Sequence, residues 1–223
     1  LSVGLERMEA LSGHPVQRIG LSATVGNPDE VAQWLSPKKG KALLTTGNRT
    51  TDLSVECAQT LPEDEIGALE LSIQPRAHAS FRRMVEILRT EPPCLVFVNS
   101  RSDAETIASR LQSMAPDVDI GVHHGSLAAE TRREMEDKLR SGELAGLVCT
   151  SSLELGIDVG KIRRILQIKS PRSVDRMLQR VGRADHRLDG IGKGHLLSWD
   201  IDDLAESAVV GRRAMLGHIE SIE

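Results

Sequence analysis

The chain has 223 residues, 39% of them hydrophobic, which is enough for one large domain with fragments and excludes a disordered chain. The formal net charge of -4 excludes a general nucleic-acid coat, so any site for a polyanion must be local. Aromatic residues make up only 2%, which disfavours base stacking as the main binding mode. No apolar run has the length of a membrane span, and the three cysteines form no CxxC pair. We therefore expect a cytoplasmic protein with reduced thiols, no metal site and no membrane partner.

Residues 1–48 are expected to contain a helix over Val3–Leu11, a short apolar strand over Val16–Leu21 and a helix over Asp29–Leu35. The turn "SATVGNP" between the last two offers Asn27 or Asp29 as a helix cap. Residues 49–75 are interpreted as a linker that contributes an edge strand over Leu53–Ala58.

Residues 76–200 alternate regularly between helices and strands. The expected helices are His78–Leu88, Asp103–Met114, Ala128–Arg140 and Arg172–Arg183, and the expected strands are Cys94–Val98, a strand near Ile120, Leu147–Cys149, Ile165–Ile168 and one within "GHLLSW". This order predicts an α/β fold with a parallel sheet and helices on both faces. Residues 201–223 read as a helix leading to a following domain.

Polar loops follow the predicted strands, at the edge where parallel sheets bind ligands. They are "NSR" after Cys94–Val98, "HHGS" after the strand near Ile120, "TSSLELGID" after Leu147–Cys149 and "KSPRS" after Ile165–Ile168. Each loop offers hydroxyl, amide or cationic donors, a composition that suits phosphates.

Between Lys161 and Arg187 the chain carries nine basic and two acidic residues. A solvated surface would explain such a run by itself. However, Arg176, Arg180 and Arg183 are spaced to share one helical face, where they repel one another unless an anion lies opposite. Guanidinium groups match phosphate oxygens, and Gly182 permits the close approach of a ligand or backbone. The segment therefore indicates a polyphosphate site.

Five segments occur in the order of motifs III, IV, IVa, V and VI of superfamily 2 helicases: "GLSAT", "LVFVNSR", "HHGSL", "TSSLELGIDVG" and "QRVGRADHR". Their wording is most similar to the Lhr (large helicase-related) group of DNA helicases. The resemblance covers residues 20–187 and implies a RecA-like fold of the P-loop NTPase type, in which two such domains clamp ATP and single-stranded nucleic acid crosses both.

The resemblance implies a role for particular residues in each motif. The arginine finger and its support would be Arg180, Arg183 and Gln179. ATP would be bound by Gly156, Asp158, Arg180, Arg183 and Arg187. The nucleic-acid strand would contact Ser100, Arg101, His124, Gly125, Thr150 and Ser151. Coupling between the two sites would involve Ser22, Ala23 and Thr24.

Several of these residues also have a simpler structural interpretation. Ser22 and Thr24 are also suited to capping the helix that follows, Asp158 to satisfying backbone donors in its loop, and His123 to a core position. His124 is the better candidate for a surface role, and Glu154 is interpreted as structural. His186 and Asp185 stand where motif VI usually has arginine and glycine, so the identity of the finger stays open between Arg180 and Arg183.

The chain has no GxxxxGK[ST] loop and no DExH-type carboxylate pair. We therefore expect a fragment that is inactive alone, with ATP and Mg²⁺ held by the phosphate loop and carboxylates of a first RecA-like domain. The expected partners are that domain and single-stranded or forked nucleic acid, DNA in particular. Two alternatives are a double-stranded DNA translocase, distinguishable by strand-displacement assays on forked and blunt duplexes, and a stand-alone nucleic-acid-binding module.

Overall fold

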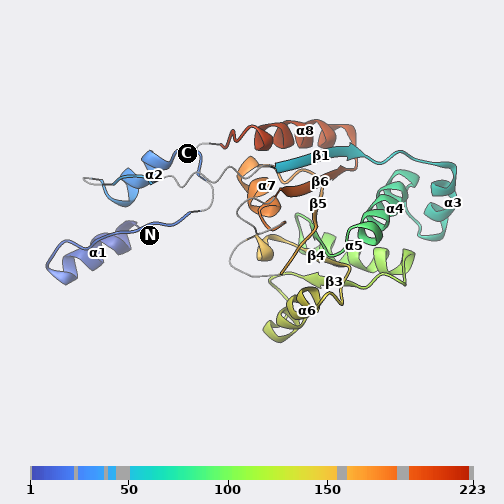
Figure 1. The fold of residues 1–223 in the computed structure, drawn as a ribbon, viewed down its shortest axis with the longest axis horizontal. Coiled ribbons are helices and arrows are strands. Elements are labelled where there is room, and N and C mark those ends of the chain that lie inside the picture. The colour runs from blue at the N-terminus through green and yellow to red at the C-terminus, as the bar shows by residue number, and fades with distance from the viewer. Residues whose placement is uncertain are drawn as a thin grey trace. The chain divides into compact units, whose positions relative to one another are not determined.

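The computed structural model describes residues 2–22, 25–37, 40–43, 51–154, 160–184 and 191–220. The chain divides into two compact units, residues 1–47 with 219–223 and residues 48–218 (Figure 1). Each unit is considered by itself below.

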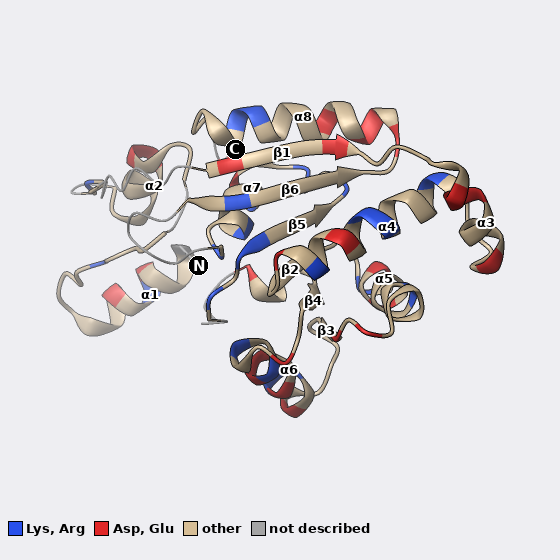
Figure 2. Ribbon diagram, turned by 45° about the vertical axis from the view of Figure 1, so that its right-hand side comes forward, with Lys and Arg blue, Asp and Glu red and all other residues tan. Residues whose placement is uncertain are grey.

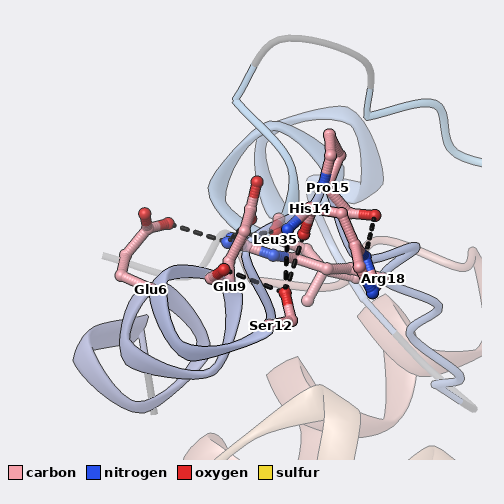
Figure 3. A network of polar contacts seen from close by, with 7 residues as sticks. All are labelled: Glu6, Glu9, Ser12, His14, Pro15, Arg18 and Leu35. Carbon is pink, nitrogen blue, oxygen red and sulfur yellow. Dashed lines mark hydrogen bonds and ion pairs between the residues drawn. The ribbon is translucent and has the colours of Figure 1, made fainter.

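The first unit contains α1 (Ser2–Ser12) and α2 (Pro28–Leu35), as expected. Arg18 organises the polar contacts of this unit (Figure 3). Its guanidinium donates to Glu6 Oε1 at 2.9 Å, to Glu9 Oε2 at 2.6 Å and to the Leu35 carbonyl at 3.1 Å. Through these bonds the Arg18 side chain, which is only 10% exposed, links α1 to the end of α2.

The strand expected over Val16–Leu21 is absent, which corrects that prediction. A strand forms only where another strand accepts and donates its backbone hydrogen bonds. Among the described residues of the first unit no strand is available to pair with it, and Ile19 and Leu21 remain 75% and 97% exposed. An apolar pattern alone is therefore not sufficient to make this segment a strand.

The second unit is built on a six-stranded, all-parallel sheet in the order β1-β6-β5-β2-β4-β3. The strands are β1 (Thr51–Cys57), β2 (Cys94–Phe97), β3 (Ile120–His123), β4 (Gly146–Cys149), β5 (Arg164–Ile168) and β6 (Gly192–Ser198). Every residue of β2 and β4 is buried, which explains their continuous apolar runs. The predicted parallel α/β sheet is confirmed, with β1 as its edge strand.

Helices cover both faces of this sheet, as predicted (Figure 1). On one face, α4 (Pro75–Thr90) and α5 (Arg101–Met114) enclose a core that includes Phe81, Met84 and Val96. On the other face lie α6 (Ala129–Ser141), α7 (Val174–Val181) and α8 (Ile201–Met215). The core under α6 contains Leu139 and Phe97.

Side chains of β1 and α7 pack closely against the backbone of β6 at Gly194. A Cβ atom there would lie 2.5 Å from Leu53 Cδ2 and 2.7 Å from Val181 Cγ2. A larger residue here would have to displace both side chains, so glycine lets α7 pack closely against β6.

Two helices differ from expectation. Residues 62–70 form α3 (Pro62–Glu70) within the segment expected to be a linker, and α3 packs against α4. The C-terminal helix ends at Met215 and packs along β1 and α7, so it belongs to the second unit. Its acidic first turn and basic last turn match the helix dipole (Figure 2). That a further domain follows stays a prediction.

Candidate functional site

The polar loops meet along the carboxyl edge of the sheet, because all six strands are parallel. The order β5-β2-β4-β3 places the loops that follow these four strands next to one another. Hydrogen bonds join neighbouring loops: Asn99 Nδ2 donates to the Ser170 carbonyl at 2.9 Å, and the Thr150 amide and the Ser152 hydroxyl both donate to the His123 carbonyl at 3.3 Å. We call this row of loops the carboxyl rim (residues 99–101, 123–126, 150–154 and 169–173).

After β2, Ser100 serves as the N-cap of α5, since its Oγ accepts from the Asp103 amide at 3.1 Å. Arg101 is exposed and its guanidinium donates to the Ser126 hydroxyl of the neighbouring loop. The rim therefore presents a cation at this point, held by a contact between two loops.

After β3, the two histidines are both buried, His123 at 1% and His124 at 5% exposed. His123 lies 2.8 Å from Ser152 Oγ and 2.9 Å from Glu136 Oε1. His124 Nε2 lies 2.7 Å from Glu105 Oε1, and this corrects the expectation of a surface position for His124. Gly125, in contrast, is exposed on the rim.

After β4, Ser151 is exposed and Thr150 half-buried, and Ser151–Leu153 form one turn of 3-10 helix. Gly156 and Asp158, the ATP-binding residues expected next in this loop, lie outside the described residues. Thr150 and Ser151 lie in the loop next to that of Gly125, since β4 pairs with β3.

The main ion pair of the site joins this loop to α7. Arg180 is 2% exposed, and its Nε and Nη2 donate to Glu154 Oε1 at 2.8 and 2.6 Å. Its Nη1 donates to Gln167, and its Cζ lies 5.0 Å from the centroid of the Phe97 ring. The expectation that Arg180 faces a phosphate thus differs from its observed position inside the unit.

Arg183 occupies a different environment three residues later. The helix α7 ends at Val181, so Arg183 lies beyond the helix that was predicted to hold three arginines on one face. Its Nε and Nη2 both donate to the Glu154 carbonyl, at 3.1 and 2.7 Å. Partial burial lowers the pKa of Arg183 from its ordinary value. Arg176 is exposed and Gln179 half-buried.

The remaining candidates lie elsewhere or are not described. Ser22 is exposed in the first unit, while Ala23, Thr24 and Arg187 lie outside the described residues. In the described part of the chain, no cluster of three or more His, Cys, Asp or Glu residues could hold a metal ion. No helix among the described residues is long and apolar enough to cross a bilayer.

Sequence reasoning missed the partners of Arg180. Glu154 was interpreted as structural without a named contact, and Gln167 was not considered. No spacing in the sequence signals this pair, because Glu154 and Arg180 are separated by strand β5. The available signal was Gln167 inside the apolar run "RILQI". A polar residue in a strand that is expected to be buried needs a hydrogen-bond partner, and one such partner here is Arg180.

The loops of the carboxyl rim lie within a segment that matches a known protein family. Residues 79–187 match the family model described as the helicase conserved C-terminal domain. The chain is 37% identical to ATP-dependent helicase Lhr-Core protein 2 of Thermococcus barophilus and 36% identical to ATP-dependent helicase Lhr-Core of Methanothermobacter thermautotrophicus. Both alignments cover 100% of this chain and 26% of the relative, so the chain spans about a quarter of those proteins.

Among solved structures, the chain is similar to the Mycobacterium smegmatis helicase Lhr bound to ssDNA and AMP-PNP. The TM-score is 0.86 at 37% identity, over 100% of this chain and 29% of that one. The similarity to Dbp5 of S. cerevisiae, with a TM-score of 0.69 at 18% identity, concerns the fold alone. The predicted RecA-like fold is confirmed.

Proposed function

Because this chain belongs to the Lhr group of the superfamily 2 helicases, we propose that it supplies the second RecA-like lobe of an ATP-driven motor that separates nucleic-acid strands. In this proposal the lobe is the unit of residues 48–218, which extends the expected residues 76–200 by β1, α3 and α8. Residues 1–47 are the end of the first lobe, and a following domain beyond α8 stays part of the proposal. The substrate is single-stranded or forked DNA.

The observation that carries this proposal is the carboxyl rim. Exposed or half-buried donors from Ser100, Arg101, Gly125, Thr150 and Ser151 lie in adjacent loops. Such a row can contact successive phosphates of one strand without reading its bases. We assign the strand-contacting role to these residues and give His124 a supporting role, since its ring is held by Glu105.

We assign the arginine finger to Arg183 and a positioning role to Arg180. Arg180 has a carboxylate partner and is buried, so moving its charge to a phosphate would leave Glu154 unpaired in the interior. Arg183 is partly exposed, and its Nε and Nη2 donate to the backbone carbonyl of Glu154. Because Glu154 also anchors Arg180, this contact holds the Arg183 guanidinium beside the Glu154 loop of the rim.

In this proposal ATP binds beside Arg183, where a cation suits a phosphate, and when bound it would supply the phosphoryl group that is transferred. Arg183 would neutralise charge developing on that group. Gln179 and Arg187 would support it, Asp158 would bind the ribose and Gly156 would keep the turn tight. Ser22, Ala23 and Thr24 would couple the two sites. We propose that the Mg²⁺ that accompanies ATP is held by the first lobe, and that this chain alone does not hydrolyse ATP.

The test is Arg183→Ala in the full-length protein, with ATP turnover and ATP binding measured separately. We expect turnover to fall by about 10³-fold or more while ATP still binds, because the finger acts on charge that develops during transfer. Arg176→Ala is the matched control, since Arg176 is an exposed arginine on α7. Normal turnover in Arg183→Ala, or an equal loss in both variants, would reject the assignment.

A further inference from the structure

The loop after β5 has an unusual backbone. Among the described residues only three non-glycine residues have φ in the left-handed region, and two of them are Lys169 at 60° and Arg172 at 67°. Side chains with a Cβ atom avoid this region, so it persists only where surrounding contacts impose it. Both residues are cations, and both are exposed.

Contacts from α8, from the loop after β2 and from β5 itself hold this shape. Between the two cations, Ser170 is 2% exposed, and its amide donates to Asp203 Oδ1 of α8 at 2.7 Å. Its hydroxyl accepts from the Arg172 amide at 3.0 Å, and its carbonyl accepts from Asn99. The Lys169 carbonyl accepts from Gln167 Nε2 at 2.8 Å. The loop is therefore rigidly mounted, although its two cationic side chains point outward.

Nothing described within the chain neutralises these two charges. Arg164 and Arg180, on the same stretch, pair with Glu91 and Glu154. In the described ranges neither Lys169 nor Arg172 forms an ion pair, and the specified contact of the Lys169 ammonium is with the Trp199 ring, 5.1 Å from its centroid. Among the described residues, the carboxylate that contacts this loop, that of Asp203, accepts from the Ser170 amide and forms no ion pair with either cation. A loop that exposes two cations in this way is suited to an external anion.

The position of the loop identifies that anion. Asn99, which holds the Ser170 carbonyl, directly precedes Ser100 and Arg101 on the rim. Strand β5 is the neighbour of β2 in the sheet, so Lys169 and Arg172 extend the row of donors beyond Arg101. Since Lys169 covers a face of Trp199, the contact offered here is charge and not base stacking.

We propose that Lys169 and Arg172 form an additional binding site for two phosphates of the nucleic-acid backbone, independent of base sequence. This inference rests on the proposed function, because it continues the same strand path. It adds residues that the helicase motifs do not include, and it predicts that the path extends across β5 toward β6.

The experiment uses the full-length protein carrying Lys169→Gln together with Arg172→Gln. Binding of a fluorescently labelled single-stranded DNA is measured by anisotropy over a range of salt concentrations. Two lost phosphate contacts should lower the slope of log affinity against log salt by about 1.4, at about 0.7 for each contact with a single strand. ATP affinity without DNA should not change.

The matched control is Arg163→Gln together with Lys193→Gln. This double substitution also removes one arginine and one lysine charge. Arg163 and Lys193 are exposed and lie at the amino ends of β5 and β6, away from the carboxyl rim. The control should keep the slope of the parent protein, and Lys169→Arg with Arg172→Lys should restore it because charge is retained. An unchanged slope in the Gln variant, or an equal change in the control, would overturn the inference. Failure of the parent protein to bind DNA would instead overturn the proposed function.

Discussion

At the scale of single residues, burial separates two arginines that the sequence presents as equivalent. Arg180 and Arg183 are three positions apart in one cationic segment. The first is buried against Glu154 and Phe97, whereas the second is partly exposed and donates to the Glu154 carbonyl. A buried charge requires a counter-charge, so Arg180 stabilises the unit, and Arg183 is the arginine that we propose as the finger.

Glu154→Ala is expected to destabilise the chain by about 3–5 kcal/mol, because it leaves the buried Arg180 guanidinium without its carboxylate. The measurement is the free energy of unfolding from urea denaturation. Glu134→Ala serves as control, since it removes an exposed i,i+4 partner of Lys138 and should cost less than about 1 kcal/mol. Similar losses in the two variants would contradict the role given to the Glu154 pair.

At the scale of elements, tertiary partners decided which local patterns became structure. The segment Val16–Leu21 has the apolar pattern of a strand but lacks a described partner, and it stays irregular. In the region expected to be a linker, α3 forms with Pro62 at its first turn and three acidic residues after it. These helix signals were readable, and α3 is secured by buried Asp64, which contacts Arg82 and His78 of α4.

The α3–α4 junction should make stability depend on pH. Burial alone would raise the pKa of Asp64, but hydrogen bonds from Arg82, the Leu61 amide and His78 together lower it well below its ordinary value. A lowered folded-state pKa gives stability that is present above about pH 4 and lost as the pH falls below it. Asp64→Asn should therefore lower the unfolding free energy at pH 7 more than at pH 3.

Asp117→Asn is the control for that comparison. The Asp117 carboxylate also pairs with an arginine, Arg89, but its side chain is 63% exposed. Its effect should be small at both pH values, since exposed pairs are screened by solvent. A pH-independent loss in Asp64→Asn would show that packing and not charge dominates at this junction.

At the scale of the whole molecule, the sheet brings distant motifs to one edge. The loops that bear Arg101, Gly125 and Thr150 are separated by tens of residues in sequence, yet the order β2-β4-β3 makes them neighbours. All three cysteines are free, with Cys94 and Cys149 buried at opposite ends of the neighbouring strands β2 and β4. Their thiols therefore report on the integrity of the sheet.

Thiol labelling at pH 8 should modify Cys57 first, because it is the partly exposed cysteine. Burial raises the pKa of Cys94 to about 12 and raises that of Cys149 further still, so neither forms the reactive thiolate in the folded protein. In denaturant all three should react, as counted by mass spectrometry. Rapid labelling of Cys94 or Cys149 without denaturant would contradict the burial of these two cysteines in the sheet.

The sequence by itself determined the class of fold, the order of the alternating elements from residue 76 onward and the helicase motifs, because these depend on local periodicity and on residue identity. It did not determine which apolar segment would find a strand partner, that His124 would be buried, or that Arg180 would be buried against the carboxylate of Glu154. Those outcomes depend on contacts between residues far apart in the chain, such as Glu154 with Arg180 and Asn99 with Ser170. Only the tertiary structure establishes these contacts, since burial and charge pairing are properties of the packed molecule.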